Sequence, residues 1–372
     1  MPVNDFLRPK LKNYVIDEGY LAFASMVSDL IFNLVKKEFT KRYPTLGLEG
    51  IHTGQFRFFA SFKTPDLSIY DPVEFHLNLY PCESREIEPK EIFLFLEEIF
   101  QKKIFGKEII SNKWIEFDGF SSSGFLFSST VRPFGGIRYC IVPSISKQSI
   151  PSLFPWYPEM KVYQKPIEDF SPYKAYSLVS VNGPENAQVF EWKKILSYAF
   201  LVWFENETRD VYNSFNRGYE NLSYSYRPFR SAVVVLIYLK MHLLIYSPDL
   251  YEEDTIFLIT FLCGLTFSQR KQKEYDRSGD PSPFTSFRQF VSESKILIHQ
   301  KTNSTNTSLW WISHPCDEST NLLESWNRDS ERGSEFFQWL DLLTEHFSDS
   351  ELQKSQLIAD EYFKKIFSPI WR

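Results

Sequence analysis

Glycine, histidine and cysteine are all scarce in this sequence, and each scarcity weakens the case for a class of site. The 372 residues include 14 glycines, with one adjacent pair at Gly135 and Gly136. The chain therefore offers little of the close backbone approach that a glycine-rich phosphate loop needs. The 6 histidines allow few imidazole acid–base centres. The 4 cysteines lie far apart in the sequence, without zinc-site or disulfide-scaffold spacing. We therefore expect no metal site and no cofactor.

The common catalytic signatures are missing as well. The sequence contains no Walker phosphate loop, no dinucleotide-binding GxGxxG, no HExxH, no GxSxG, no kinase motif and no EF-hand loop. These signatures exist because their chemistry needs particular residues at fixed spacing. Their absence leaves the sequence without a direct sign of catalysis.

An excess of positive charge is also absent. The chain has 41 Lys and Arg against 47 Asp and Glu, a net charge of −6. The excess of acidic residues falls entirely within residues 183–372. Because duplex nucleic acid is bound mainly through basic surfaces, we do not expect it as a partner.

Long uncharged hydrophobic runs do not occur. The two most apolar stretches, residues 231–247 and 255–267, are short, and the first contains Lys240 and His242. A membrane-spanning helix needs about 20 nearly uncharged residues, so these stretches favour a buried helical hairpin without membrane insertion. Within it, His242 is expected to be a core histidine with satisfied hydrogen bonds. The first residues carry no apolar signal core, and we expect a cytoplasmic protein.

What the sequence does contain is aromatic residues and clear periodicity. Its 36 Phe, 20 Tyr and 9 Trp supply a large core volume. Before residue 182, helical spacing alternates with period-two spacing, which is typical of an α+β domain. In chain order the predicted elements are a helix over 16–41, strands over 55–63 and 73–80, a helix over 89–103, and strands over 114–117, 124–131, 136–142 and 175–181.

The sequence after residue 182 has helical periodicity throughout. A possible cap, a proline and an early acid at residues 182–185 are typical of a helix start. Helices are predicted near 185–214, 227–246, 252–274, 288–299, 317–328, 333–346 and 349–367. The predicted fold class is therefore α+β, with a mainly antiparallel N-terminal sheet and two helices in residues 1–182, followed by an all-helical domain in residues 183–372.

The first candidate site is the polar side of the predicted strand 73–80. Glu74, His76, Asn78 and Tyr80 alternate with apolar residues, so their side chains share one face of the sheet. A carboxylate beside an imidazole can orient its tautomer, as a general base requires. Pairing with the predicted strand 55–63 could bring Arg57 or Lys63 opposite them, and Arg57 or Arg138 could neutralise an anionic substrate. The alternative is a solvated sheet face with cross-strand charge pairs.

The second candidate is the segment 217–230, where arginines and aromatic residues interleave between two predicted helices. Such a composition suits nucleotide or single-stranded RNA binding, and it is also favoured in protein–protein contacts. The proposed binding residues are Arg217, Tyr219, Tyr224, Tyr226, Arg227 and Arg230.

The function that these observations favour is binding or regulation through contacts with another protein, because no catalytic motif is present. The first alternative is a hydrolase or transferase with Glu74, His76 and Arg57 at its site. The second alternative is nucleotide or single-stranded RNA binding through residues 217–230.

Overall fold

The structure is a computed structural model. It describes residues 18–57, 71–83, 86–101, 115–130, 135–150, 169–182, 188–208, 231–266, 283–302, 308–347, 361 and 365–367.

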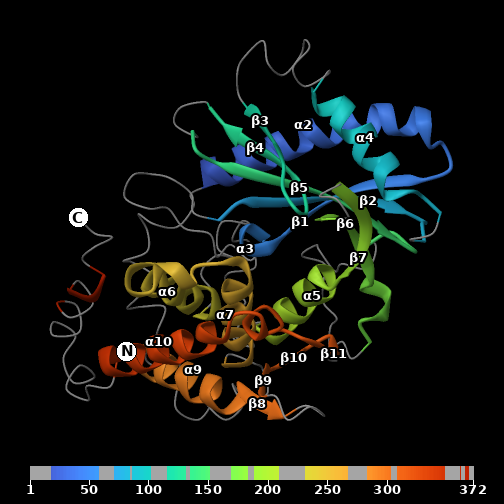
Figure 1. Cartoon of the computed structure of the whole chain (residues 1–372). Helices are drawn as coiled ribbons and strands as arrows, with labels where there is room; N and C mark the ends of the chain where they lie inside the picture. The colour runs from blue at the N-terminus through green and yellow to red at the C-terminus, as the bar shows by residue number, and fades with distance from the viewer. Residues whose placement is uncertain are drawn as a thin grey trace, which may run out of the picture. The chain divides into compact units, whose positions relative to one another are not determined.

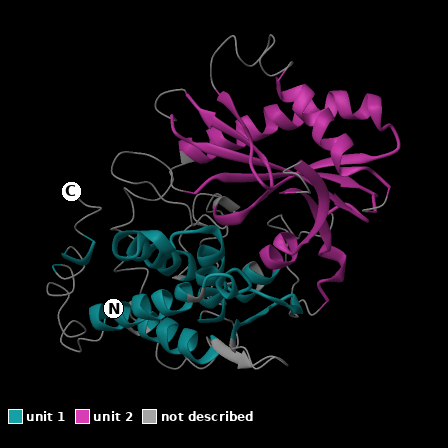
Figure 2. Ribbon diagram, in the orientation of Figure 1, with its two compact units in different colours: residues 1–15, 203–372 teal, residues 16–202 magenta. Residues whose placement is uncertain are grey.

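The chain divides into two compact units, which are coloured separately in Figure 2. Unit 1 comprises residues 1–15 and 203–372, and unit 2 comprises residues 16–202. The predicted domain boundary near 182 falls at the end of a strand. The next strand pairs back onto that one, so the sheet unit continues to residue 202.

Unit 2 is built on a seven-stranded sheet whose strands follow the order β1-β2-β5-β4-β3, with β6 beside β5 and β7 beside β6. The β2–β5 pair is parallel and the other pairs are antiparallel. This arrangement confirms the predicted α+β class with a mainly antiparallel N-terminal sheet. The strands are β1 (Gly47–Thr53), β2 (Val73–Tyr80), β3 (Ile115–Phe120), β4 (Phe125–Ser129), β5 (Arg138–Ser146), β6 (Ala175–Asn182) and β7 (Gln188–Ile195).

Two helices cover one face of this sheet, α2 (Glu18–Arg42) and α4 (Pro89–Ile99), as Figure 1 shows. Both match the predicted helices closely. The apolar residues of β2, such as Phe75 and Leu77, pack in one core with the inward sides of α2 and α4. Burial of this apolar surface is the main source of stability for the unit. The opposite face of the sheet is therefore the one left for polar residues.

The predicted strand 55–63 is wrong at its start. The first strand is β1, and it is followed directly by a short helix, α3 (Gly54–Arg57). Gly54 has a φ of 65° and turns the chain between them. The alternating phenylalanines that suggested a strand lie partly in α3 and otherwise outside the described residues. β1 was not predicted because its glycines and polar residues do not resemble a run of strand-forming residues.

The helix predicted from residue 185 is also wrong at its start. Residues 188–195 form β7, and α5 (Ser197–Glu207) begins only after it. Packing against α4 explains this result: Phe190 stacks on Phe93 with ring centroids 4.1 Å apart. Trp192 Nε1 also donates a hydrogen bond to the carbonyl oxygen of Ile87 at 2.8 Å. Tertiary contacts therefore override the local helix signals.

Unit 1 is mainly helical, as predicted, but it also contains two short hairpins. Besides the end of α5, its described helices are α6 (Ser231–Tyr246), α7 (Glu253–Thr266), α9 (Pro283–Leu297) and α10 (Ser330–Phe347), with single 3-10 turns at Pro248–Leu250 and Ser325–Asn327. The hairpins pair β8 (His299–Thr302) with β9 (Ser308–Trp311), and β10 (Ser313–His314) with β11 (Asp317–Asn321). In the described part of the chain, no helix is long and apolar enough to cross a membrane.

The helix predicted over 317–328 is replaced by β11 and a 3-10 turn. Asp317, at the start of the predicted helix, accepts hydrogen bonds from the backbone and the hydroxyl of Ser319, at 3.1 and 2.6 Å. These local bonds offer the backbone an alternative to a helix. The helix predicted over 349–367 lies almost wholly outside the described residues.

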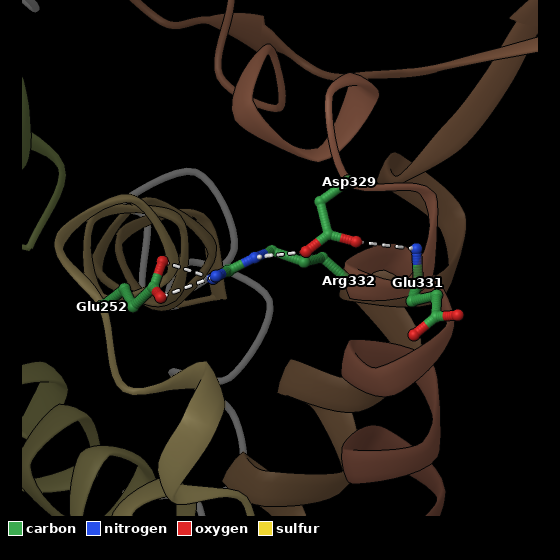
Figure 3. A network of polar contacts seen from close by, with 4 residues as sticks. All are labelled: Glu252, Asp329, Glu331 and Arg332. Atoms are coloured by element: carbon green, nitrogen blue, oxygen red, sulfur yellow. Dashed lines mark hydrogen bonds and ion pairs between the residues drawn. The ribbon is translucent and has the colours of Figure 1, made fainter.

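One polar network joins two ends of helices within unit 1 (Figure 3). Arg332, in the first turn of α10, binds Glu252 through both terminal nitrogens, and its Nε lies 3.2 Å from Asp329 Oδ2. The other oxygen of Asp329 accepts the backbone N–H of Glu331 at 3.2 Å. Since these residues sit where α7 and α10 begin, the network fixes the two helix starts together.

Candidate functional site

The second face of the unit 2 sheet carries an extended set of polar side chains. Strand alternation and register place its members on one side. They are Glu49 and Thr53 of β1, Glu74, His76 and Asn78 of β2, and Arg138, Cys140, Ser144 and Ser146 of β5. This set is called the polar face below.

At one end of the polar face, Glu49 is locked in a hydrogen-bond network. Asn78 Nδ2 and the backbone N–H of Ile150 donate to Glu49 Oε1 at 2.7 and 2.8 Å, and Ser149 Oγ donates to Oε2 at 2.7 Å. Asn78 also donates to Ser146 Oγ at 2.7 Å. Glu49 is 8% exposed. With both oxygens bonded, this carboxylate anchors the chain that follows β5.

At the other end, Glu74 is held through a single oxygen. Thr53 Oγ1 donates to Glu74 Oε1 at 2.6 Å, and His76 Nε2 lies 2.7 Å from the same oxygen. Glu74 Oε2 has no hydrogen-bond partner among the described residues and lies beside Gly54, where an added Cβ would come within 2.9 Å of it. The Glu74 side chain is 26% exposed. One oxygen of the carboxylate is thus fixed and the other is open.

The surroundings of Glu49 and Glu74 shift the pKa values of these two carboxyl groups in opposite directions. Burial raises the pKa of Glu49, although its hydrogen bonds partly oppose the shift. Burial also acts to raise the pKa of Glu74, but the hydrogen bond and charge of His76, together with the Thr53 bond, outweigh it and lower the pKa overall. Glu74 is therefore the carboxyl group of this face that is held ionised.

Tyr198 of α5 covers the middle of the polar face. Its hydroxyl lies 2.8 Å from Ser144 Oγ, and its ring lies 5.2 Å from that of His76. Burial raises the pKa of Tyr198 well above its ordinary value, and the nearby charges of Glu49 and Glu74 act in the same direction. Tyr198 is therefore a neutral hydrogen-bonding group at this position.

His76 occupies a different place from the one that a general base would need. It is 1% exposed, and its Nδ1 has no hydrogen-bond partner among the described residues. The sequence predicts that Glu74 orients an accessible His76. In the structure these two roles are exchanged. His76 supports Glu74 from the interior, and Glu74 presents the accessible oxygen.

The two predicted arginines lie on different elements of unit 2. Arg57 lies in α3 rather than in a strand paired with β2, and Thr53 occupies the register position opposite Glu74. Arg138 is exposed at the start of β5. The second candidate site, residues 217–230 with Arg217, Tyr219, Tyr224, Tyr226, Arg227 and Arg230, lies outside the described residues.

Sequence analysis missed Thr53, Glu49 and Tyr198. Thr53 and Glu49 belong to the unrecognised strand β1, and Tyr198 belongs to a helix predicted to start twelve residues too early. The alternation Glu49, Ile51, Thr53 was a weak period-two signal that could have revealed β1.

Comparison with known proteins places this site in a recognisable fold. No protein-family model matches the sequence, and no curated protein does. The CD-NTase CdnG of Bradyrhizobium diazoefficiens, solved in complex with GTP, is similar over 100% of this chain and 99% of its own, with a TM-score of 0.60 and 11% identity. CdnC of Escherichia coli MS115-1, solved with ATP, is similar over 99% of this chain and 98% of its own, with a TM-score of 0.53 and 10% identity.

This likeness corrects the function favoured by the sequence. A fold shared over the whole length with CD-NTases, the cGAS/DncV-like nucleotidyltransferases, contradicts the interpretation as a binding or regulatory protein that acts through contacts with another protein. It agrees better with the first alternative, in which the site lies at Glu74 and His76. At these identities the likeness defines the fold alone.

Proposed function

We propose that the polar face of unit 2 is a nucleotide-binding site and that nucleotides, rather than a protein partner, are the ligands on which this protein acts. One observation carries the proposal. In a chain with the CD-NTase fold, the polar face presents an ionised carboxylate with one fixed oxygen and one open oxygen. A protein contact surface does not require such a group to be held in place by buried partners.

The contacts around Glu74 support this proposal. Two donors, Thr53 and His76, converge on the same oxygen and restrict the rotation of the carboxylate. A solvated surface glutamate does not need this support, whereas a ligand-binding group gains affinity from being fixed in advance. Two of the similar structures were solved with GTP and with ATP, so these two nucleotides are the appropriate probes.

The test is isothermal titration of the full chain with GTP and with ATP, for the wild type and for Glu74→Gln. Loss of the open charged oxygen should weaken binding by about tenfold or more, because a hydrogen bond to a charged group contributes about 1.5–3 kcal/mol.

Glu91→Gln is the matched control. Glu91 belongs to the same unit, accepts a hydrogen bond from Tyr43 Oη at 2.7 Å and is 44% exposed on α4, which covers the other face of the sheet. This variant should bind as the wild type does. Equal weakening by both variants, or the absence of binding to the wild type, would overturn the proposal.

A further inference from the structure

The polar face also indicates how a nucleotide would be held. Nucleotidyl and phosphoryl transfer generally use Mg²⁺ ions held by carboxylates and by the substrate phosphates, and a two-ion clamp requires ligands that reach both ions. Carboxylate, carbonyl and water oxygens suit Mg²⁺, whereas thiols suit softer metals. Whether this face can hold such ions is decided by the side chains around Glu74.

These side chains do not fit a pair of divalent ions. The position opposite Glu74 on the neighbouring parallel strand is Cys140, and the next residue of β2 on the same face is His76. Cys140 Sγ lies against Gly124, where an added Cβ would come within 2.6 Å of it. Glu49, the other carboxylate of the polar face, has both oxygens bonded within the protein. Among the described residues, no three His, Cys, Asp or Glu side chains are grouped so that they could hold a metal ion.

Charge then determines which part of a nucleotide can approach Glu74. Without a bridging cation, an ionised carboxylate repels phosphate groups, but it accepts hydrogen bonds from hydroxyl and N–H groups. A nucleotide carries such donors on its ribose and on its base. Glu74 Oε2 is the oxygen that is free to accept them, since Thr53 and His76 both bond Oε1.

We infer that the polar face recognises the ribose or base of a nucleotide through Glu74 Oε2, without divalent metal ions, and that it does not support metal-assisted nucleotidyl transfer. The inference rests on the proposed nucleotide site and specifies its chemistry. Thr53 and His76 are positioning residues for Glu74. Gly54 leaves room beside the open oxygen.

The test compares ligands and metal conditions on the full chain. GTP, ATP, guanosine and adenosine are titrated in excess EDTA and again in excess MgCl₂. We expect each nucleotide to bind with affinities within about threefold in the two conditions. The nucleoside that shares its base with the tighter-binding nucleotide should retain most of that nucleotide's affinity. Glu74→Gln should weaken the binding of this nucleoside and of the nucleotide equally. Binding that Mg²⁺ strengthens by about tenfold or more, or that requires the phosphates, would overturn the inference.

Direct metal binding provides an independent measurement. In a Mn²⁺ titration followed by electron paramagnetic resonance, the wild type should bind no ion at this face. A variant carrying His76→Asp and Cys140→Asp places two more carboxylates beside Glu74 and should gain Mn²⁺ binding. Mn²⁺ binding to the wild type that Glu74→Gln abolishes would overturn the inference even if the double variant fails to fold.

Product formation completes the test. Incubation of the wild type with GTP and ATP in Mg²⁺ or Mn²⁺ should yield no nucleotidyl-transfer product, and a product that Glu74→Gln abolishes would overturn the inference. A wild type that binds none of the four ligands in either condition overturns the proposed nucleotide site instead, so failure of the site and failure of its metal independence can be told apart.

Discussion

Each unit of this protein contains a buried histidine, and the two histidines have different kinds of hydrogen-bond partner. His76 in unit 2 is 1% exposed and lies 2.7 Å from a carboxylate oxygen of Glu74. His242 in unit 1 is 0% exposed; Trp339 Nε1 lies 3.1 Å from its Nδ1, and its Nε2 lies 2.9 Å from Nδ1 of His346. Both histidines are almost fully buried. His76 is paired with the accessible carboxylate of Glu74, whereas His242 and His346 lie among aromatic rings.

The two histidines therefore differ in their partners rather than in their burial. Since indole is only a donor, His242 Nδ1 accepts from Trp339, and His242 donates through Nε2 to His346. Both ring nitrogens are then satisfied, as expected for a core histidine. His76 instead directs its one observed hydrogen bond at Glu74, whose second oxygen remains open.

The largest expected effect is the loss of His242. His242→Ala leaves a cavity and two unpaired nitrogen atoms in the core of unit 1, so we expect α6 to lose about 2–4 kcal/mol of opening free energy. Hydrogen exchange of α6 peptides, measured by mass spectrometry on the full chain, reports this change. His346→Ala is the control: it removes the same histidine–histidine bond from a half-buried position and should cost about 1 kcal/mol. Equal losses for the two variants would contradict the core role of His242.

The next effect is a pH dependence confined to unit 1. Burial lowers the pKa of His242 well below its ordinary value, with the charge of His346 acting in the same direction, and burial also lowers the pKa of His346. The unfolded state therefore takes up protons first as the pH falls below about 6.5, and stability decreases from there towards the lower folded-state pKa values. Above that pH these histidines contribute no pH dependence to the stability.

Hydrogen exchange between pH 7.5 and 5.5, corrected for intrinsic exchange rates, should show α6 and α10 opening more readily on the acid side. The double variant His242→Gln and His346→Gln should lack this slope. A slope that persists unchanged in the double variant would assign the pH dependence to other groups.

The smallest expected effect distinguishes the two carboxylates of the polar face. Glu49 has a raised pKa, so its contribution to stability falls as the pH rises from the unfolded value of about 4.5 towards the folded value. Glu74 has a lowered pKa, so its contribution is present above about 4.5 and is lost as the pH falls. Urea unfolding at pH 7 and pH 4 should show Glu74→Gln costing more at pH 7 and Glu49→Gln costing more at pH 4. If both variants lose more stability at the same one of these two pH values, the two environments do not differ as described.

The sequence was sufficient for elements whose local pattern agrees with their packing. The helices at α2 and α4 and the strand at β2 were predicted within a few residues, because their apolar spacing faces the core directly. β1 and β7 were not predicted, since each is stabilised by pairing and by contacts with residues distant in the sequence. Trp192 illustrates this, because its bond to Ile87 spans more than a hundred residues.

The arrangement of the candidate site was predicted in part for the same reason. Period-two spacing placed Glu74 and His76 on one face, which the register confirms. Their relative exposure could not be predicted, because it depends on Thr53 from a strand that was missed and on Tyr198 from the following helix. The absence of glycine-rich and metal-binding motifs left the sequence without a sign of catalysis, and the similarity in fold could be found only from the structure.

A crystal structure of the full chain grown with GTP in the presence of EDTA would show the contacts of Glu74 directly. We predict a ribose hydroxyl or a base N–H within hydrogen-bond distance of Glu74 Oε2, with the phosphates directed away from this carboxylate. A nucleotide bound elsewhere, or one whose phosphates lie at Glu74, would contradict this prediction.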